Sequence, residues 1–160
     1  MREKYWEFYT RTRFELCYFS QYLNDSYRWQ RLIDTFLAVA SCGSIAAWAV
    51  WNVVPVLWSV IIAASQVMTA VREYLPYAKR IHALNGLNPR LEAVVACIDR
   101  EWFSVDRGEL DDGKINELIY SFRKECADLS NKYLIDVYFP EREDLKKAAQ
   151  EDAECYFDCY

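Results

Sequence analysis

The chain has 160 residues and a mass of 18.9 kDa, which is the size of one domain and too short for a barrel enzyme or a two-domain nucleotide-binding enzyme. Its net charge of −5 and pI near 5.0 provide no basic field, so direct nucleic-acid binding is not expected. The mean hydropathy of −0.18 is that of a soluble protein, yet the 37 residues 35–71 contain no Asp, Glu, Lys, Arg or His.

Residues 1–34 predict an N-terminal aromatic amphipathic helix. They contain ten aromatic residues and neither Gly nor Pro. Apolar positions recur every three or four residues, as one helix face requires, at Tyr5, Phe8, Tyr9, Leu16, Phe19, Tyr22 and Leu23. We expect this helix to continue into the uncharged segment and to use its apolar face for a core or for self-association. An interfacial membrane helix is the alternative.

Residues 35–74 predict a transmembrane hairpin. A single helix through the uncharged segment would be roughly 55 Å long, whereas a hydrocarbon core is about 30 Å thick. The chain therefore has to fold back, and Asn52 and Pro55 provide a turn at which one helix ends and the next begins. This places the two spans at about 32–51 and 54–74.

The flanks of the hairpin predict its orientation. Aromatic anchors for the two membrane interfaces are Trp29, Trp48, Trp51, Trp58 and Tyr74. Cations precede the first span and follow the second, at Arg28, Arg31, Arg72, Lys79 and Arg80, while the turn has none. By the positive-inside rule both termini are expected to be cytoplasmic, in the inner membrane of a bacterium. A hairpin buried in a soluble bundle is the alternative, although neither arm has a charged outer stripe.

Small and weakly polar residues line parts of both spans. The first span has Ser41, Gly43, Ser44 and Ala47, and the second has Ser65, Gln66 and Thr69. Such residues let helices approach closely and hydrogen-bond across the contact. The same side chains would line a pore if several hairpins assembled. Gln66 is the strongest pore candidate, because an amide at membrane depth needs a partner or water, but it can also bond within one hairpin.

Residues 75–160 predict a cytosolic helical region. We expect Leu75-Pro76 to end the second span, Asn85-Gly86 to end a short helix, and Asn88-Pro89 to begin another. Asp111-Asp112 begins the helix with the most regular periodicity, and a charged helix follows Pro140, over residues 141–157. Because no long alternation of polar and apolar residues occurs, the predicted class is an all-α membrane protein whose flanking amphipathic helices form a bundle.

Residues for catalysis or metal binding are scarce. His82 is the only histidine, so neither a histidine dyad nor a typical zinc site is expected. Cys155 and Cys159 lie one helical turn apart, but two ligands are a weak metal signal, and their role stays open. The few glycines form no phosphate-binding loop. The sequence predicts neither an enzyme nor a cofactor.

The order of these segments resembles a known family. An aromatic N-terminal helix, the run from Phe36 to Trp51, a Pro turn, a second span with Gln66, and a cytosolic stretch with Trp102 and Gly108 before a capped helix resemble the SLATT group of bacterial two-transmembrane effectors. The resemblance covers about residues 1–135. It rests on architecture and pattern.

That resemblance implies the killing arm of an antiphage system. Such a protein would oligomerise in the lipid bilayer after a signal, then permeabilise and depolarise the inner membrane, causing abortive infection. The chain has no separate nucleotide-sensing domain, so we expect a regulatory partner encoded nearby, such as a nucleotide-signalling enzyme or a retron. A non-lytic membrane adaptor that holds a soluble partner through its cytosolic helices is the alternative.

Overall fold

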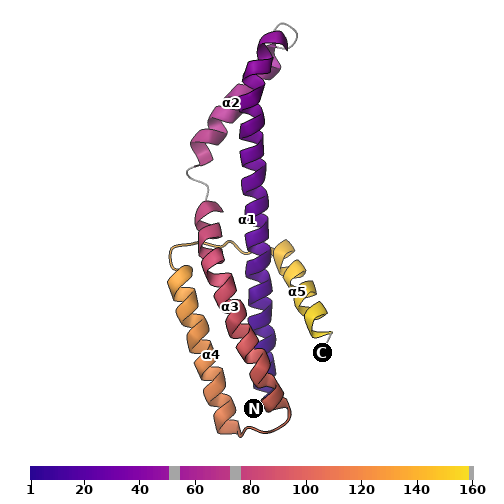
Figure 1. Cartoon of the computed structure of the whole chain (residues 1–160), viewed down its shortest axis with the longest axis vertical. Helices are drawn as coiled ribbons and strands as arrows, with labels where there is room; N and C mark the ends of the chain where they lie inside the picture. The colour runs from indigo at the N-terminus through magenta and orange to yellow at the C-terminus, as the bar shows by residue number, and fades with distance from the viewer. Residues whose placement is uncertain (51–54, 73–76, 159–160) are drawn as a thin grey trace. The chain divides into compact units, whose positions relative to one another are not determined.

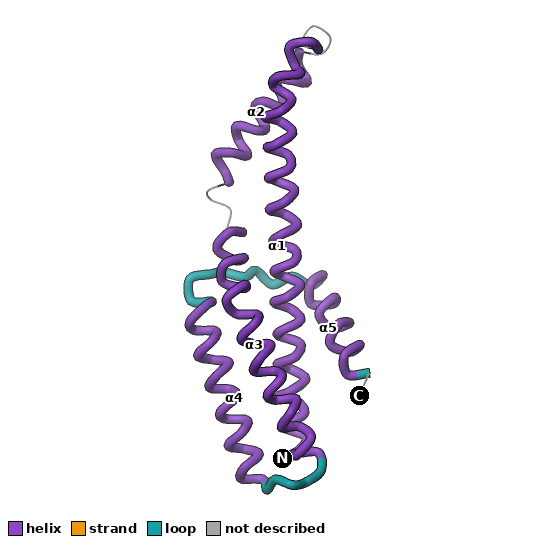
Figure 2. The backbone as a smooth tube through the Cα atoms, viewed as in Figure 1, coloured by secondary structure: helices purple, strands orange, loops and turns teal. Residues whose placement is uncertain are grey.

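A computed structural model describes residues 1–50, 55–72 and 77–158, with side chains described outside 41–58 and 72–76. These ranges hold five helices: α1 (Arg2–Val50), α2 (Pro55–Arg72), α3 (Tyr77–Asp106), α4 (Asp112–Tyr133) and α5 (Glu143–Phe157). No strand occurs in the same ranges, which confirms the all-α class (Figure 2). The predicted turn at 51–54 and the predicted break at 75–76 lie outside the described residues.

The chain divides into two compact units. Unit 1 comprises Met1–Asn24 and Lys79–Tyr160, and unit 2 comprises Asp25–Ala78. α1 continues without a break from the aromatic segment into the uncharged one, so it contributes residues to both units. The N-terminal aromatic segment therefore packs with the C-terminal helices, although the whole of unit 2 separates them in the sequence.

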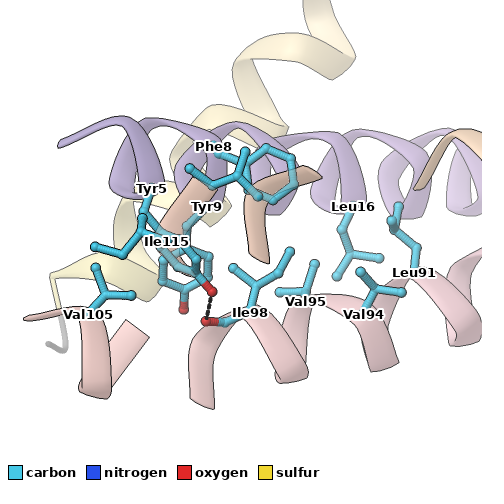
Figure 3. Close-up of a cluster of buried hydrophobic side chains, with 11 residues drawn as sticks. Tyr5, Phe8, Tyr9, Leu16, Leu91, Val94, Val95, Ile98, Val105 and Ile115 are labelled. Carbon is cyan, nitrogen blue, oxygen red and sulfur yellow. Dashed lines mark hydrogen bonds between the residues drawn. The ribbon is translucent and has the colours of Figure 1, made fainter. Parts of the chain in front are cut away.

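Unit 1 is a helical bundle. The first half of α1, then α3, α4 and α5, run alternately in opposite directions (Figure 1). Its main core joins α1, α3 and α4 through the side chains of Tyr5, Phe8, Tyr9, Leu16, Leu91, Val94, Val95, Ile98, Val105, Ile115 and Ile119 (Figure 3). The apolar stripe predicted on residues 1–34 supplies the α1 side of this core, because helical spacing places its members on one face.

α5 packs on α1 through small residues. Ala149 and Ala153 are buried in a cluster with Cys17, and partly buried Phe14 and Tyr18 pack against it. Small side chains let the backbone of α5 approach α1 closely. α5 begins at Glu143, two residues later than predicted.

The predicted helix boundaries at 85–89 are wrong. α3 runs through Gly86 and has Pro89 inside it. Leu84, Leu87 and Leu91 are all buried, so the apolar stripe continues across the proline with helical spacing and its packing favours one helix. Pro89 removes one helical hydrogen bond, but Asn85 and Pro89 lie on the exposed side of α3, where water can donate to the Asn85 carbonyl oxygen instead.

Gly86 serves a close contact between helices instead of ending one. A Cβ atom at this position would lie 2.6 Å from Cε1 of the Tyr133 ring, at the end of α4. Only glycine leaves room for that ring. Gly86 does mark a structural constraint, but that constraint is the close approach of α4 and not the end of a helix.

The start of α4 agrees with the prediction. Asp111 has an extended backbone, and its carboxylate accepts a hydrogen bond of 2.7 Å from the backbone amide of Lys114. This is the N-cap arrangement that satisfies an otherwise unpaired amide. Gly108 precedes it with φ of 71°, a conformation that favours glycine, so the chain can turn from α3 into α4.

Unit 2 combines the second half of α1 with α2. α2 begins at Pro55, which fits proline at the first helical position. Among the described residues, no helix has the length and apolar character that crossing a bilayer requires. The centre of the predicted hairpin, 41–58, and residues 72–76 lie outside the residues whose side chains are described.

Candidate functional site

Unit 2 exposes a large apolar surface. Its exposed large hydrophobic side chains are Trp29, Leu32, Phe36 and Val39 on α1, and Val60, Ile62, Val67 and Val71 on α2. Val39 is 66% exposed and Val67 is 62% exposed. The four residues on α1 are spaced by three, four and three positions, so they form one continuous stripe. An exposed apolar stripe of this kind marks a surface that meets lipid or protein.

A second stripe on the same helices is partly covered. On α1, Ser26 is buried and Gln30, Ile33, Leu37 and Ala40 are half-buried. On α2, the half-buried positions are Ile61, Ser65 and Met68. Both sets alternate steps of four and three residues, which is the pattern of two helices that pack along a seam. Unit 2 therefore has an inner face at this seam and an outer face that is largely apolar.

The two hydroxyl groups predicted to bond across helices or to line a pore from the second span make their hydrogen bonds within α2. Ser65 Oγ donates a hydrogen bond of 2.8 Å to the carbonyl oxygen of Ile62, and Thr69 Oγ1 donates one of 2.8 Å to that of Ser65. Gln66 is exposed, and its side chain makes no hydrogen bond to the described residues. Of the three predicted polar groups, only the Gln66 amide still needs a partner from outside the described part of α2.

The other predicted positions are only partly placed. Ser41, Gly43, Ser44, Ala47 and Trp48 belong to α1, but their side chains lie outside the described residues. The side chain of Trp58 in α2 also lies outside the described residues. Trp51 and Tyr74 lie wholly outside them. Trp29 is 46% exposed.

A polar groove of about 570 Å³ runs along unit 1 between α1 and α4. Its lining residues are Lys4, Glu7, Phe8, Arg11, Thr12, Glu15, Asn116, Ile119, Arg123 and Cys126. Arg11 forms an ion pair of 3.1 Å with Glu15. The Arg123 guanidinium lies 5.6 Å from the centre of the Phe8 ring. Cations and anions are therefore mixed, and the groove has no strong preference for one sign of charge.

The thiol in this groove is not an activated nucleophile. Burial raises the pKa of Cys126 to about 11, and the charges of Glu15 and Glu125 add to the rise. Because the thiolate is the reactive form, a thiol with this pKa is protonated and inert at neutral pH. Cys126 is therefore not suited to act as a covalent nucleophile.

Two buried tyrosines hold α1 against α3. The Tyr5 hydroxyl donates a hydrogen bond of 2.9 Å to the carbonyl oxygen of Ile98 (Figure 3), and the Tyr9 hydroxyl donates one of 2.7 Å to Asp99 Oδ1. Burial raises the pKa of both phenols; hydrogen bonding with Tyr156 and Asp99 adds to the rise at Tyr9. Both therefore stay neutral donors at physiological pH, which is a structural role.

An aromatic hollow at one end of unit 1 was not predicted. Its volume is about 680 Å³, and it is lined by Arg2, Glu3, Trp6, Trp102, Phe103, Asp106 and Phe157. These residues come from α1, α3 and α5, so only the folded bundle brings them together. The spacing of residues along any one of these helices gives no sign of it.

Metal-binding clusters do not occur in the described part of the chain, where no three His, Cys, Asp or Glu residues could hold an ion. His82 and Cys155 are exposed. Cys159 lies outside the described residues, so the role of Cys155 and Cys159 stays open.

Neither a family model nor a curated protein nor a solved structure matches this chain. The resemblance to the SLATT group therefore rests on the order of the segments and the residues quoted above. What the chain does has to follow from the physical chemistry of its two units.

Proposed function

We propose that this chain is a membrane effector whose unit 2 inserts into the inner membrane and, as an oligomer, makes it permeable to ions. The observation that carries the proposal is the outer face of unit 2, which is uncharged and largely apolar from Thr35 to Val71. Exposing such a face to lipid is favourable, whereas exposing it to water costs free energy.

Permeation requires several copies, because two helices cannot enclose a channel. The exposed stripes on α1 and α2 are available for contacts between copies as well as for lipid. Gln66 lies beside Val67 on the outer side of α2, so assembled copies would bring their amides to shared contacts. An amide there would bond to another copy or to water in a pore.

Membrane potential tests the proposal directly. A voltage-sensitive dye is read in bacteria after induction of the chain alone and with its genomic neighbours, while membrane fractionation confirms insertion. Depolarisation before loss of viability is expected. Gln66→Leu and Gly43→Leu should abolish it without reducing the membrane-bound fraction, and Val60→Leu, which keeps an apolar residue on α2, should not. If both test variants depolarise fully, the pore face is wrongly placed.

A non-lytic membrane adaptor is the second candidate function. It is favoured by the self-satisfied hydroxyls of Ser65 and Thr69, which need no water-filled pore, and by the aromatic hollow of unit 1. In this case unit 2 anchors the chain and unit 1 binds a soluble protein. Membrane-bound protein with an unchanged potential under every condition, including phage challenge, would support the adaptor over the effector.

A further inference from the structure

The aromatic hollow of unit 1 is built from ring faces. The Trp6 and Trp102 rings lie 4.8 Å apart between centroids, and Phe157 meets Trp6 edge-on at 5.1 Å. Phe103, beside them, is 50% exposed. Aromatic faces carry partial negative charge, so a cluster of this kind attracts organic cations.

Two carboxylates flank these rings. Asp106 forms an ion pair with Arg2, whose guanidinium also lies 5.9 Å from the centre of the Trp102 ring. Glu3 has no ion pair or hydrogen bond from its side chain to the described residues. The hollow therefore contains two anions and one cation, and one negative charge is left uncompensated.

Arg2 shows which ligand the hollow accepts. Its guanidinium already combines a carboxylate with an aromatic face inside the hollow. A guanidinium is planar, stacks on rings and is weakly hydrated, so it gains more than an ammonium from such a surface. A volume of about 680 Å³ leaves space for another side chain and part of its backbone.

We propose that the aromatic hollow binds an arginine side chain of a partner polypeptide, which pairs with Glu3 and stacks beside Trp6 and Phe103. Arg2 competes for the same surface from within the chain. The proposal is independent of whether unit 2 permeabilises a membrane, since every residue that carries it belongs to unit 1.

A direct binding measurement tests this. The full chain, in a non-ionic detergent, is titrated into a fluorescein-labelled peptide with one central arginine, and polarisation is read at about 0.1 M salt. The same peptide with citrulline, a neutral isostere of arginine, is the matched probe. We expect the arginine peptide to bind at least about threefold more tightly.

Opposite effects of two substitutions make the test specific. Glu3→Gln should weaken binding of the arginine peptide by about two- to fivefold, because it removes the free carboxylate. Arg2→Gln should tighten binding by about two- to fivefold, because it frees Asp106 and the face of Trp102. Damage to the fold cannot produce both signs.

Matched controls test whether overall charge or non-specific binding to exposed aromatic side chains causes these effects. Glu92→Gln, exposed on α3, and Arg11→Gln, outside the hollow, make the same charge changes as the two test variants and should leave the Kd unchanged. Phe103→Ala should weaken binding by about two- to fivefold, whereas Tyr120→Ala, 71% exposed on α4, should not.

Three outcomes would overturn the proposal. Equal affinity for the arginine and citrulline peptides would show that the hollow does not recognise the positive charge. Weaker or unchanged binding in Arg2→Gln would show that Arg2 is not a competitor. Binding of the wild-type chain to phosphatidylcholine vesicles that Glu3→Gln abolishes, without arginine-peptide binding, would assign the hollow to a lipid headgroup instead.

Discussion

The two halves of α1 treat their apolar residues in opposite ways. In unit 1, Tyr5 and Tyr9 are buried against α3, whereas in unit 2, Leu32 and Val39 of the same helix are exposed. Both halves have helical periodicity, so periodicity does not explain the difference. What differs is the covering: unit 1 supplies three further helices, and unit 2 supplies one. The second half of α1 therefore needs another apolar partner, which we propose to be lipid and further copies.

The units also differ in how they satisfy polar atoms. Tyr5 and Tyr22 in unit 1 donate to backbone carbonyls of distant segments, and these bonds fix one packing. Ser65 and Thr69 in unit 2 donate to their own helix. Bonds within one helix fix no neighbour, so they allow the outer faces of unit 2 to accept different partners. Internal contacts thus specify the packing of unit 1, whereas these two bonds in unit 2 specify no neighbour.

The largest expected effect comes from a charge on the outer face of unit 2. Ile62→Asp should lower insertion by about 3–4 kcal/mol, because a carboxylate near the centre of a span is costly and an isoleucine is lost. Carbonate extraction of membranes should recover the variant mainly in the soluble fraction. Tyr120→Asp on exposed α4 should stay membrane-bound. Normal membrane retention of Ile62→Asp would show that this face does not lie in the bilayer.

A matched pair of valines measures the difference in covering. Val94→Ala in the core of unit 1, where Val94 is 3% exposed, should destabilise the chain by about 2 kcal/mol through lost burial and a cavity. Val39→Ala should cost less than about 0.5 kcal/mol in detergent, because its side chain is already exposed. Thermal unfolding followed by circular dichroism gives both values; equal losses would contradict the comparison.

Alkaline pH should weaken unit 1 through its buried phenols. The folded-state pKa of Tyr9 is raised, so its stabilising effect is complete below about pH 10, where the unfolded phenol ionises, and is lost as the pH rises further. Tyr9→Phe should lose about 1.5 kcal/mol at pH 7 with its bond to Asp99, and its stability should fall less steeply above pH 10. Denaturant titrations at pH 7 to 11 measure this. An unchanged alkaline slope would contradict it.

The smallest effect tests the contact at Gly86. Gly86→Ala should destabilise the chain by about 1 kcal/mol, because the strain against Tyr133 exceeds the gain in helix propensity. In a Tyr133→Ala background the same substitution should stabilise by about 0.5–1 kcal/mol. Double-mutant analysis of thermal unfolding reads the change of sign. If the sign stays the same, the ring does not crowd Gly86.

Local signals predicted much of unit 1. The pair Asp111-Asp112 predicted the start of α4, and spacing of three and four predicted the core positions Tyr5, Tyr9 and Leu16. The same reasoning failed at Pro89, since local propensity favours a helix start there while burial on both sides favours continuity. Packing energy decides between the two, and packing energy cannot be inferred from the propensities of neighbouring residues.

The candidate sites divide in the same way. The uncharged run in unit 2 could be named from the sequence, because a segment without charge is a local property. The aromatic hollow could not, since Trp6, Phe103 and Phe157 are brought together only by the packing of α1, α3 and α5. The cation preference that we propose for it depends further on Glu3, which makes no ion pair with the described residues because Arg2 pairs with Asp106.

The sequence by itself determined the helical class, the uncharged segment from Thr35 to Val71 and the apolar stripes, because these depend on residue type and spacing along one chain. Only the tertiary structure decided that α3 continues through Pro89, that Gly86 makes room for a ring, and that the N-terminal aromatics meet the C-terminal helix. These outcomes depend on contacts between segments far apart in sequence, and their energies exceed local preferences only once the bundle has formed.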